Sequence, residues 1–85
     1  MPESLKVKIK LFAAAKDAIG SDSVDVELTQ PATIADLKTA LTQQYPAIKE
    51  MTSRSAFAVD QEFAIDSTLL NEAMEIGLIP PVSGG

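Results

Sequence analysis

Residues 5–12, LKVKIKLF, alternate regularly between apolar and basic side chains. One side of the strand carries Val7, Ile9 and Leu11, and the other carries Lys6, Lys8 and Lys10. A period of two is the pattern of a β-strand with one buried side and one solvent-facing side. Phe12 falls on the lysine side by parity, so we expect its ring to lie at or near the surface.

A short helix and a second strand follow. Residues 13–20, AAAKDAIG, predict a helix that ends at Gly20, a common C-cap residue. Residues 23–29, SVDVELT, alternate like the first strand and carry Asp25 and Glu27 on the polar side. If the two strands pair antiparallel, these acids lie across from the lysines, and each pair contributes a few tenths to about 1 kcal/mol.

The strongest helical pattern lies between Pro31 and Pro46. Thr33 is a good N-cap, and Asp36 favours the positive end of the helix dipole. Apolar residues recur at helical spacing on one side: Ile34, Leu37, Leu41 and Tyr45. This stripe predicts the helix that covers the sheet, and Pro46 ends it.

Residues 47–55 show no clean period and are expected to form a connection. Residues 56–65, AFAVDQEFAI, predict a hairpin with its turn at Asp60–Gln61. Residues 66–73 predict a turn, and residues 74–80, MEIGLIP, a last strand.

One amphipathic helix that packs on one face of a mixed sheet makes a two-layer α+β architecture. We therefore expect a β-grasp, ubiquitin-like fold, with the order of the later strands left open. Residues 1–79 form the predicted domain, and residues 80–85 a flexible, extended Gly-Gly tail.

Composition narrows the chemistry. A length of 85 residues supports one domain. The sequence has neither His nor Cys, which excludes sites that use an imidazole base, a Cys nucleophile or thiolate metal ligands. The net charge of −5 disfavours nucleic acid as a partner. No apolar run approaches the ~20 residues of a membrane span. We expect a cytoplasmic protein with no bound cofactor or metal.

The final residues, IPPVSGG, suggest where the chemistry lies. Pro80 and Pro81 end a strand and direct the chain away from the body. Val82, Ser83 and Gly84 carry little bulk, so they fit a narrow channel, and the reactive group at the tip is the carboxylate of Gly85. Adenylation by ATP would activate it, and a sulfur donor could then leave a thiocarboxylate. The alternative is a frayed end without chemistry.

Several motifs together resemble the MoaD family, the small subunits of molybdopterin synthase. They are KIKLFAAAKDAIG, TIADLKTAL, AFAVDQEFA and, most specifically, LIPPVSGG. One stretch, NEAMEIG, departs from the family, because Ala73 and Met74 stand where relatives carry glycine and aspartate.

The resemblance implies a sulfur carrier that is no enzyme by itself. A MoeB-like enzyme would use ATP to adenylate Gly85, which then becomes a thiocarboxylate. The tail would enter the large subunit, MoaE, and give sulfur to cyclic pyranopterin monophosphate for the dithiolene of the molybdenum cofactor. The family complex is a heterotetramer with the active-site pocket on the large subunit.

The family also carries an apolar docking patch, which the resemblance assigns here to Phe12, Phe63 and Ile79. Lys16 matches a basic position that could pair with an acidic partner, and residues 80–83 would contact the channel. Two other functions remain open: a ThiS-type or other ubiquitin-like sulfur carrier or modifier, and a non-covalent β-grasp interaction module.

Overall fold

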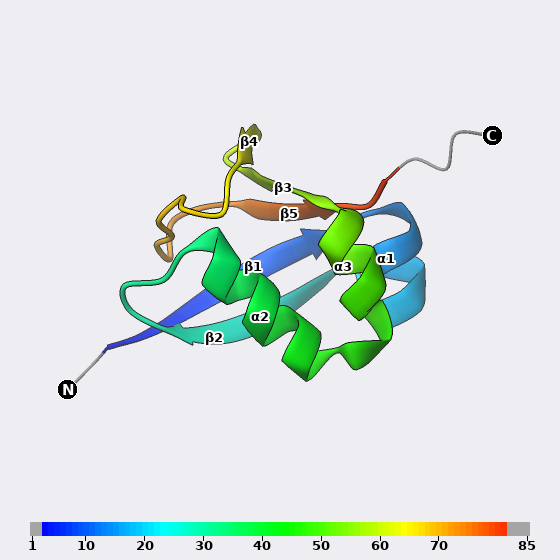
Figure 1. Ribbon diagram of the computed structural model, residues 1–85, viewed down its shortest axis with the longest axis horizontal. Coiled ribbons are helices and arrows are strands. Elements are labelled where there is room, and N and C mark those ends of the chain that lie inside the picture. Colours follow the sequence, from blue (N-terminus) through cyan, green and yellow to red (C-terminus); the bar gives the residue numbers. More distant parts are fainter. Residues whose placement is uncertain (1–2, 82–85) are drawn as a thin grey trace.

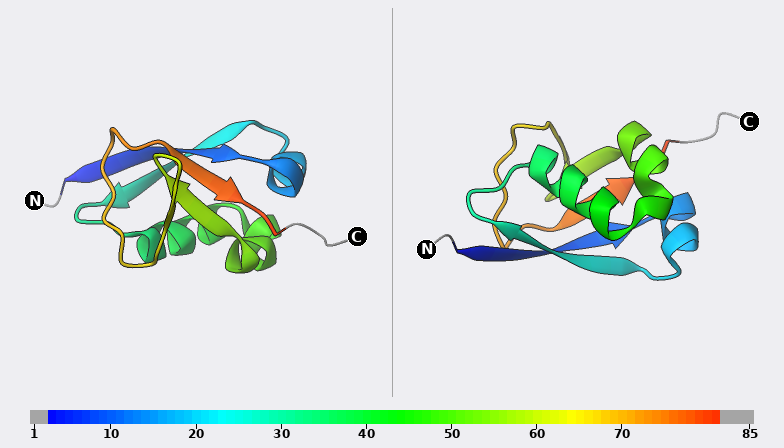
Figure 2. Two further views of the ribbon diagram at one scale, coloured as in Figure 1. Left: turned by 90° about the horizontal axis from the view of Figure 1, so that it is seen from above. Right: turned by 60° about the horizontal axis from the view of Figure 1, so that its bottom comes forward.

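The computed structural model describes residues 3–81. It contains one mixed five-stranded sheet with the strand order β2-β1-β5-β3-β4. The strands are β1 (Ser4–Leu11), β2 (Ser23–Thr29), β3 (Ala56–Val59), β4 (Glu62–Ala64) and β5 (Ile76–Ile79). The helices are α1 (Ala13–Ile19), α2 (Ile34–Gln44) and α3 (Lys49–Arg54), with a 3₁₀ turn η1 over Pro46–Ile48. Figures 1 and 2 show α2 and α3 on the same face of the sheet. The predicted two-layer α+β, β-grasp architecture is confirmed.

The first two strands pair as the alternation predicts. β1 runs antiparallel to β2, with Lys6 opposite Glu27 and Lys8 opposite Asp25. Lys10 faces Ser23 instead, and its ammonium lies 3.7 Å from the carboxylate of Glu75. The acidic partner of the third lysine therefore comes from the other side of β1.

Helix α2 begins with the predicted cap. Thr33 and Asp36 form a capping box, in which each side chain binds the backbone N–H of the other. Leu37 and Leu41 are fully buried under the sheet, as the helical spacing predicts. This helix supplies the main apolar face that covers the sheet.

The prediction for residues 47–55 was wrong. Instead of an open connection, the chain forms η1 and α3, and Ile48 and Thr52 are buried there. Pro46 begins the 3₁₀ turn, where its missing N–H costs no hydrogen bond. A six-residue helix is too short to display a period of 3.6, which is why the sequence pattern missed it.

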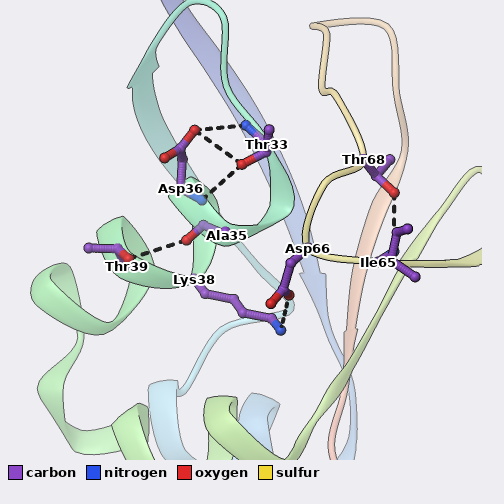
Figure 3. A network of polar contacts seen from close by, with 8 residues as sticks. All are labelled: Thr33, Ala35, Asp36, Lys38, Thr39, Ile65, Asp66 and Thr68. Carbon is purple, nitrogen blue, oxygen red and sulfur yellow. Dashed lines mark hydrogen bonds and ion pairs between the residues drawn. The ribbon is translucent and has the colours of Figure 1, made fainter.

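The second half of the sheet closes through a tight hairpin. Asp60 and Gln61 both have positive φ angles, 51° and 71°, as a type I′ turn requires. The following loop is tied to the start of α2: Ile34 and Ala35 donate to the carbonyls of Thr68 and Asp66. Figure 3 shows the ion pair between Lys38 and Asp66, 2.6 Å long, beside the same helix end.

Strand β5 lies in the middle of the sheet, parallel to β1 and antiparallel to β3. This placement settles the strand order that the alternation left open. The turn before β5, where the family resemblance breaks down, is built by Asn71, which accepts from the N–H of Ala73 and, through its carbonyl, from Met74. The strand ends beside α1 and α3, and Pro80 follows it (Figure 1).

Thr52 offers a test of the packing. Its side chain is 1% exposed, and its hydroxyl has no hydrogen-bond partner among the described residues. Burying an unpaired hydroxyl costs about 1–3 kcal/mol. We expect Thr52→Val to raise the free energy of unfolding by about 1 kcal/mol in urea titrations. Thr39→Val, at an exposed hydroxyl that already donates to Ala35, should give no gain, and an equal gain at both sites would contradict this account.

Candidate functional site

The three residues assigned to the docking patch lie at one hollow on the sheet. Phe12, Phe63 and Ile79 line an apolar groove of about 230 Å³. Their exposed fractions are 46%, 79% and 36%, so large apolar surfaces face solvent. The exposure predicted for Phe12 from parity is confirmed, and the structure brings all three residues together.

The sheet register explains the hollow. Four neighbouring strands align Lys10, Gly77, Ala58 and Phe63 in one cross-strand row. The two middle members have little or no side chain, so they form a low floor. Phe12 and Phe63 line the same hollow.

Charged and polar groups border the apolar groove. Lys10, Gln61 and Glu75 complete its lining, and the Lys10–Glu75 ion pair is exposed. Such an exposed pair adds little stability, and it places one charge of each sign at the edge of an apolar surface. The arrangement has an apolar centre and a polar rim, which is the anatomy of a protein interface.

Lys16 does not line this groove. Its ammonium lies 2.8 Å from the carboxylate of Asp22, at the end of α1. The hydrogen bond between them, together with their Coulombic attraction, raises the pKa of Lys16 and lowers the pKa of Asp22. Both groups are solvent-exposed, and the role of Lys16 in partner binding stays a prediction.

The root of the tail lies at a second hollow. Pro80 is half-buried and Pro81 is exposed, and both line this hollow with Ala47, Met51 and Arg54. Met51 and Arg54 come from α3, which the sequence pattern did not predict because residues 47–55 were expected to form a connection. The rest of the tail lies outside the described residues: Val82 and Ser83, predicted to contact the partner's channel, and Gly84 and Gly85, assigned to the predicted sulfur chemistry.

Within residues 3–81, no group of three or more His, Cys, Asp or Glu side chains is arranged to hold a metal ion. The same residues include no helix that is long and apolar enough to span a membrane. The candidate sites among these residues are therefore the apolar groove and the hollow at the root of the tail.

Known proteins match over the whole fold. The ThiS family model matches residues 9–85. The molybdopterin synthase sulfur carrier subunit of Dictyostelium discoideum is 40% identical over 85 residues, which span 96% of this chain and 99% of that protein.

Solved structures agree with this match. SAMP1 from Haloferax volcanii has a TM-score of 0.83 at 28% identity, covering 94% of this chain and 99% of that one. A chain from the complex of subunits 1 and 2 of molybdopterin-converting factor from Helicobacter pylori shares the fold, with a TM-score of 0.66 at 23% identity over 95% of this chain and 100% of that one. From its sequence matches, the chain belongs to the ThiS family and to the family of molybdopterin synthase sulfur carrier subunits.

Proposed function

We propose that this protein carries sulfur as a thiocarboxylate on Gly85 and delivers it to the large subunit of molybdopterin synthase. The observation that carries the proposal is the match, over nearly the full length of both chains, to a relative named as the sulfur carrier subunit of that enzyme. The apolar groove supports it, because a carrier must dock before its tail can enter another protein.

The chemistry proceeds in three steps. A carboxylate oxygen of Gly85 attacks the α-phosphorus of ATP on a MoeB-like activating enzyme and releases pyrophosphate. A sulfide-level donor, supplying HS⁻, then attacks the carbonyl carbon and displaces AMP, which leaves the thiocarboxylate. On the large subunit its sulfur attacks a carbon of cyclic pyranopterin monophosphate and displaces the oxygen substituent from that carbon. Water then cleaves the acyl–sulfur bond and restores the Gly85 carboxylate, and a second charged carrier repeats the transfer to supply the second sulfur of the dithiolene.

The body of this protein has a passive part in these steps. Its groove supplies binding energy, and Pro80 and Pro81 restrict the direction in which the chain leaves β5. Acid–base groups and the substrate pocket belong to the partners in this proposal, in keeping with a sequence without His or Cys. The proposal keeps the cytoplasmic location expected from the sequence.

A second function has one observation in its favour. The similarity to SAMP1, a small archaeal modifier protein, is the reason to test attachment to other proteins as well. An activated Gly85 would then form an amide bond with a lysine amine and release AMP, instead of accepting sulfur.

Reconstitution distinguishes these functions. The thiocarboxylated protein is mixed with the large subunit and cyclic pyranopterin monophosphate, and formation of the dithiolene is followed by mass spectrometry. We expect conversion that depends on both subunits. Failure here, combined with success in thiazole formation, would assign the chain to the ThiS-type carriers, and recovery of lysine conjugates alone would assign it to the modifiers.

A further inference from the structure

Gly77 is an unusual residue for its place in the sheet. It lies in the central strand β5, paired with Lys10 of β1 and Ala58 of β3. Glycine weakens a strand interior because it has no side chain to pack and loses more conformational entropy on folding. Its backbone does not need glycine, since Gly20 has the one positive φ among the glycines of residues 3–81.

The space above Gly77 explains the glycine. A β-carbon added there would meet Cε2 of Phe12 at 3.1 Å, with Cδ2 and Cζ of the same ring at 4.0 Å. These are the three nearest atoms, so one edge of the Phe12 ring occupies the place that a side chain would take. A contact of 3.1 Å is tighter than a β-carbon normally makes, and the ring would have to move.

The backbone next to Phe12 is unfavourable too. Phe12 leaves β1 in an extended conformation, and Ala13 then has a φ of 50°, in the left-handed region that alanine seldom occupies. One of the two unfavourable positions, Gly77, lies against the half-exposed Phe12 ring, and the other, Ala13, follows Phe12 in the chain. Packing in the hydrophobic core explains neither position, because Ala13 is exposed and Gly77 is only half-buried.

We propose that Gly77 is a positioning residue: its missing side chain lets the Phe12 ring lie down on β5 as one wall of the apolar groove. A larger residue at position 77 would displace the ring and so change the shape that the groove offers to a partner. The consequence for binding rests on the proposed function, in which the large subunit of molybdopterin synthase occupies this groove.

The contact can be tested without a partner. Nuclear Overhauser effects between the α protons of Gly77 and the ring protons of Phe12 are expected in the free protein. Their absence would overturn the inference and would leave the proposed function untouched.

The effect on docking is tested with Gly77→Val and purified large subunit, by titration calorimetry. We expect the variant to bind about tenfold or more weakly, as is usual when an aromatic anchor is displaced. Its melting temperature should be equal to or above that of the wild type, because valine is favourable in a strand. Gly77→Ala, which requires a shift of a few tenths of an ångström, should bind within about threefold of the wild type.

The control is the same substitution without the ring. In a Phe12→Ala background, Gly77→Val should weaken binding less than twofold, which would give a large coupling between the two positions. Equal losses with and without Phe12, or wild-type affinity for Gly77→Val, would overturn the inference. Absence of binding by the wild-type protein would instead contradict the proposed function. The nuclear Overhauser effects between Gly77 and Phe12 would still test whether the ring lies over Gly77.

Discussion

One residue added after Gly85 will abolish sulfur transfer and leave the fold intact. The extension moves the terminal carboxylate by about 3.3–3.6 Å and turns the Gly85 carbonyl into an amide, which ATP does not adenylate. Misplacement of a reacting group by about 1 Å can already cost about a hundredfold in rate, so the loss should exceed that factor. The measurement is dithiolene formation by the reconstituted synthase.

The matched control adds the residue at the other end of the chain. An extra residue before Met1 leaves the Gly85 carboxylate unchanged and should retain full activity. Melting temperatures of both variants should equal that of the wild type, because neither change reaches the core. Sulfur transfer by the C-terminally extended protein would contradict the mechanism.

Phe63→Asp will greatly weaken docking without unfolding the protein. The Phe63 side chain is 79% exposed and lines the apolar groove, so it can be replaced without opening a cavity in the core. A buried aromatic anchor at an interface contributes about 2 kcal/mol or more, and the charge adds a desolvation cost. We expect at least a thirtyfold rise in the Kd for the large subunit, roughly the factor that 2 kcal/mol represents.

Ile65→Asp is the control for this substitution. Ile65 is similarly exposed, at 69%, but it does not line the groove. Its replacement places the same charge near the same edge of the sheet and should change the Kd by less than about threefold. Equal losses for both variants would mean that the contact surface lies elsewhere on this edge or that general charge repulsion is responsible.

Local rules predicted much of the fold. Alternation gave the buried and exposed sides of β1, and the exposure of Phe12 followed from parity alone. The Thr33 N-cap and the turn at Asp60–Gln61 were also predicted from short-range chemistry, and the structure shows in addition that Asp36 completes a capping box. These features depend on residues close in sequence, which is why the sequence could specify them.

Features that depend on register or length were out of reach. Periodicity gives the side of a strand but not its neighbours, so the place of β5 between β1 and β3 stayed open. The position of the Phe12 ring over Gly77 depends on that pairing. The sequence indicated it only by the presence of a glycine within a strand. Helix α3 was missed because one and a half turns do not define a period.

The central claim is that Gly85 is the loading point and that the folded body is chemically passive. The direct measurement is mass spectrometry of the intact protein and of its C-terminal peptide, after incubation with a MoeB-like activating enzyme, ATP and a sulfur donor. We expect replacement of one oxygen by sulfur, located at Gly85 and dependent on ATP. An unchanged mass, under conditions in which the same enzyme charges a known carrier, or sulfur located at any other residue, would contradict it.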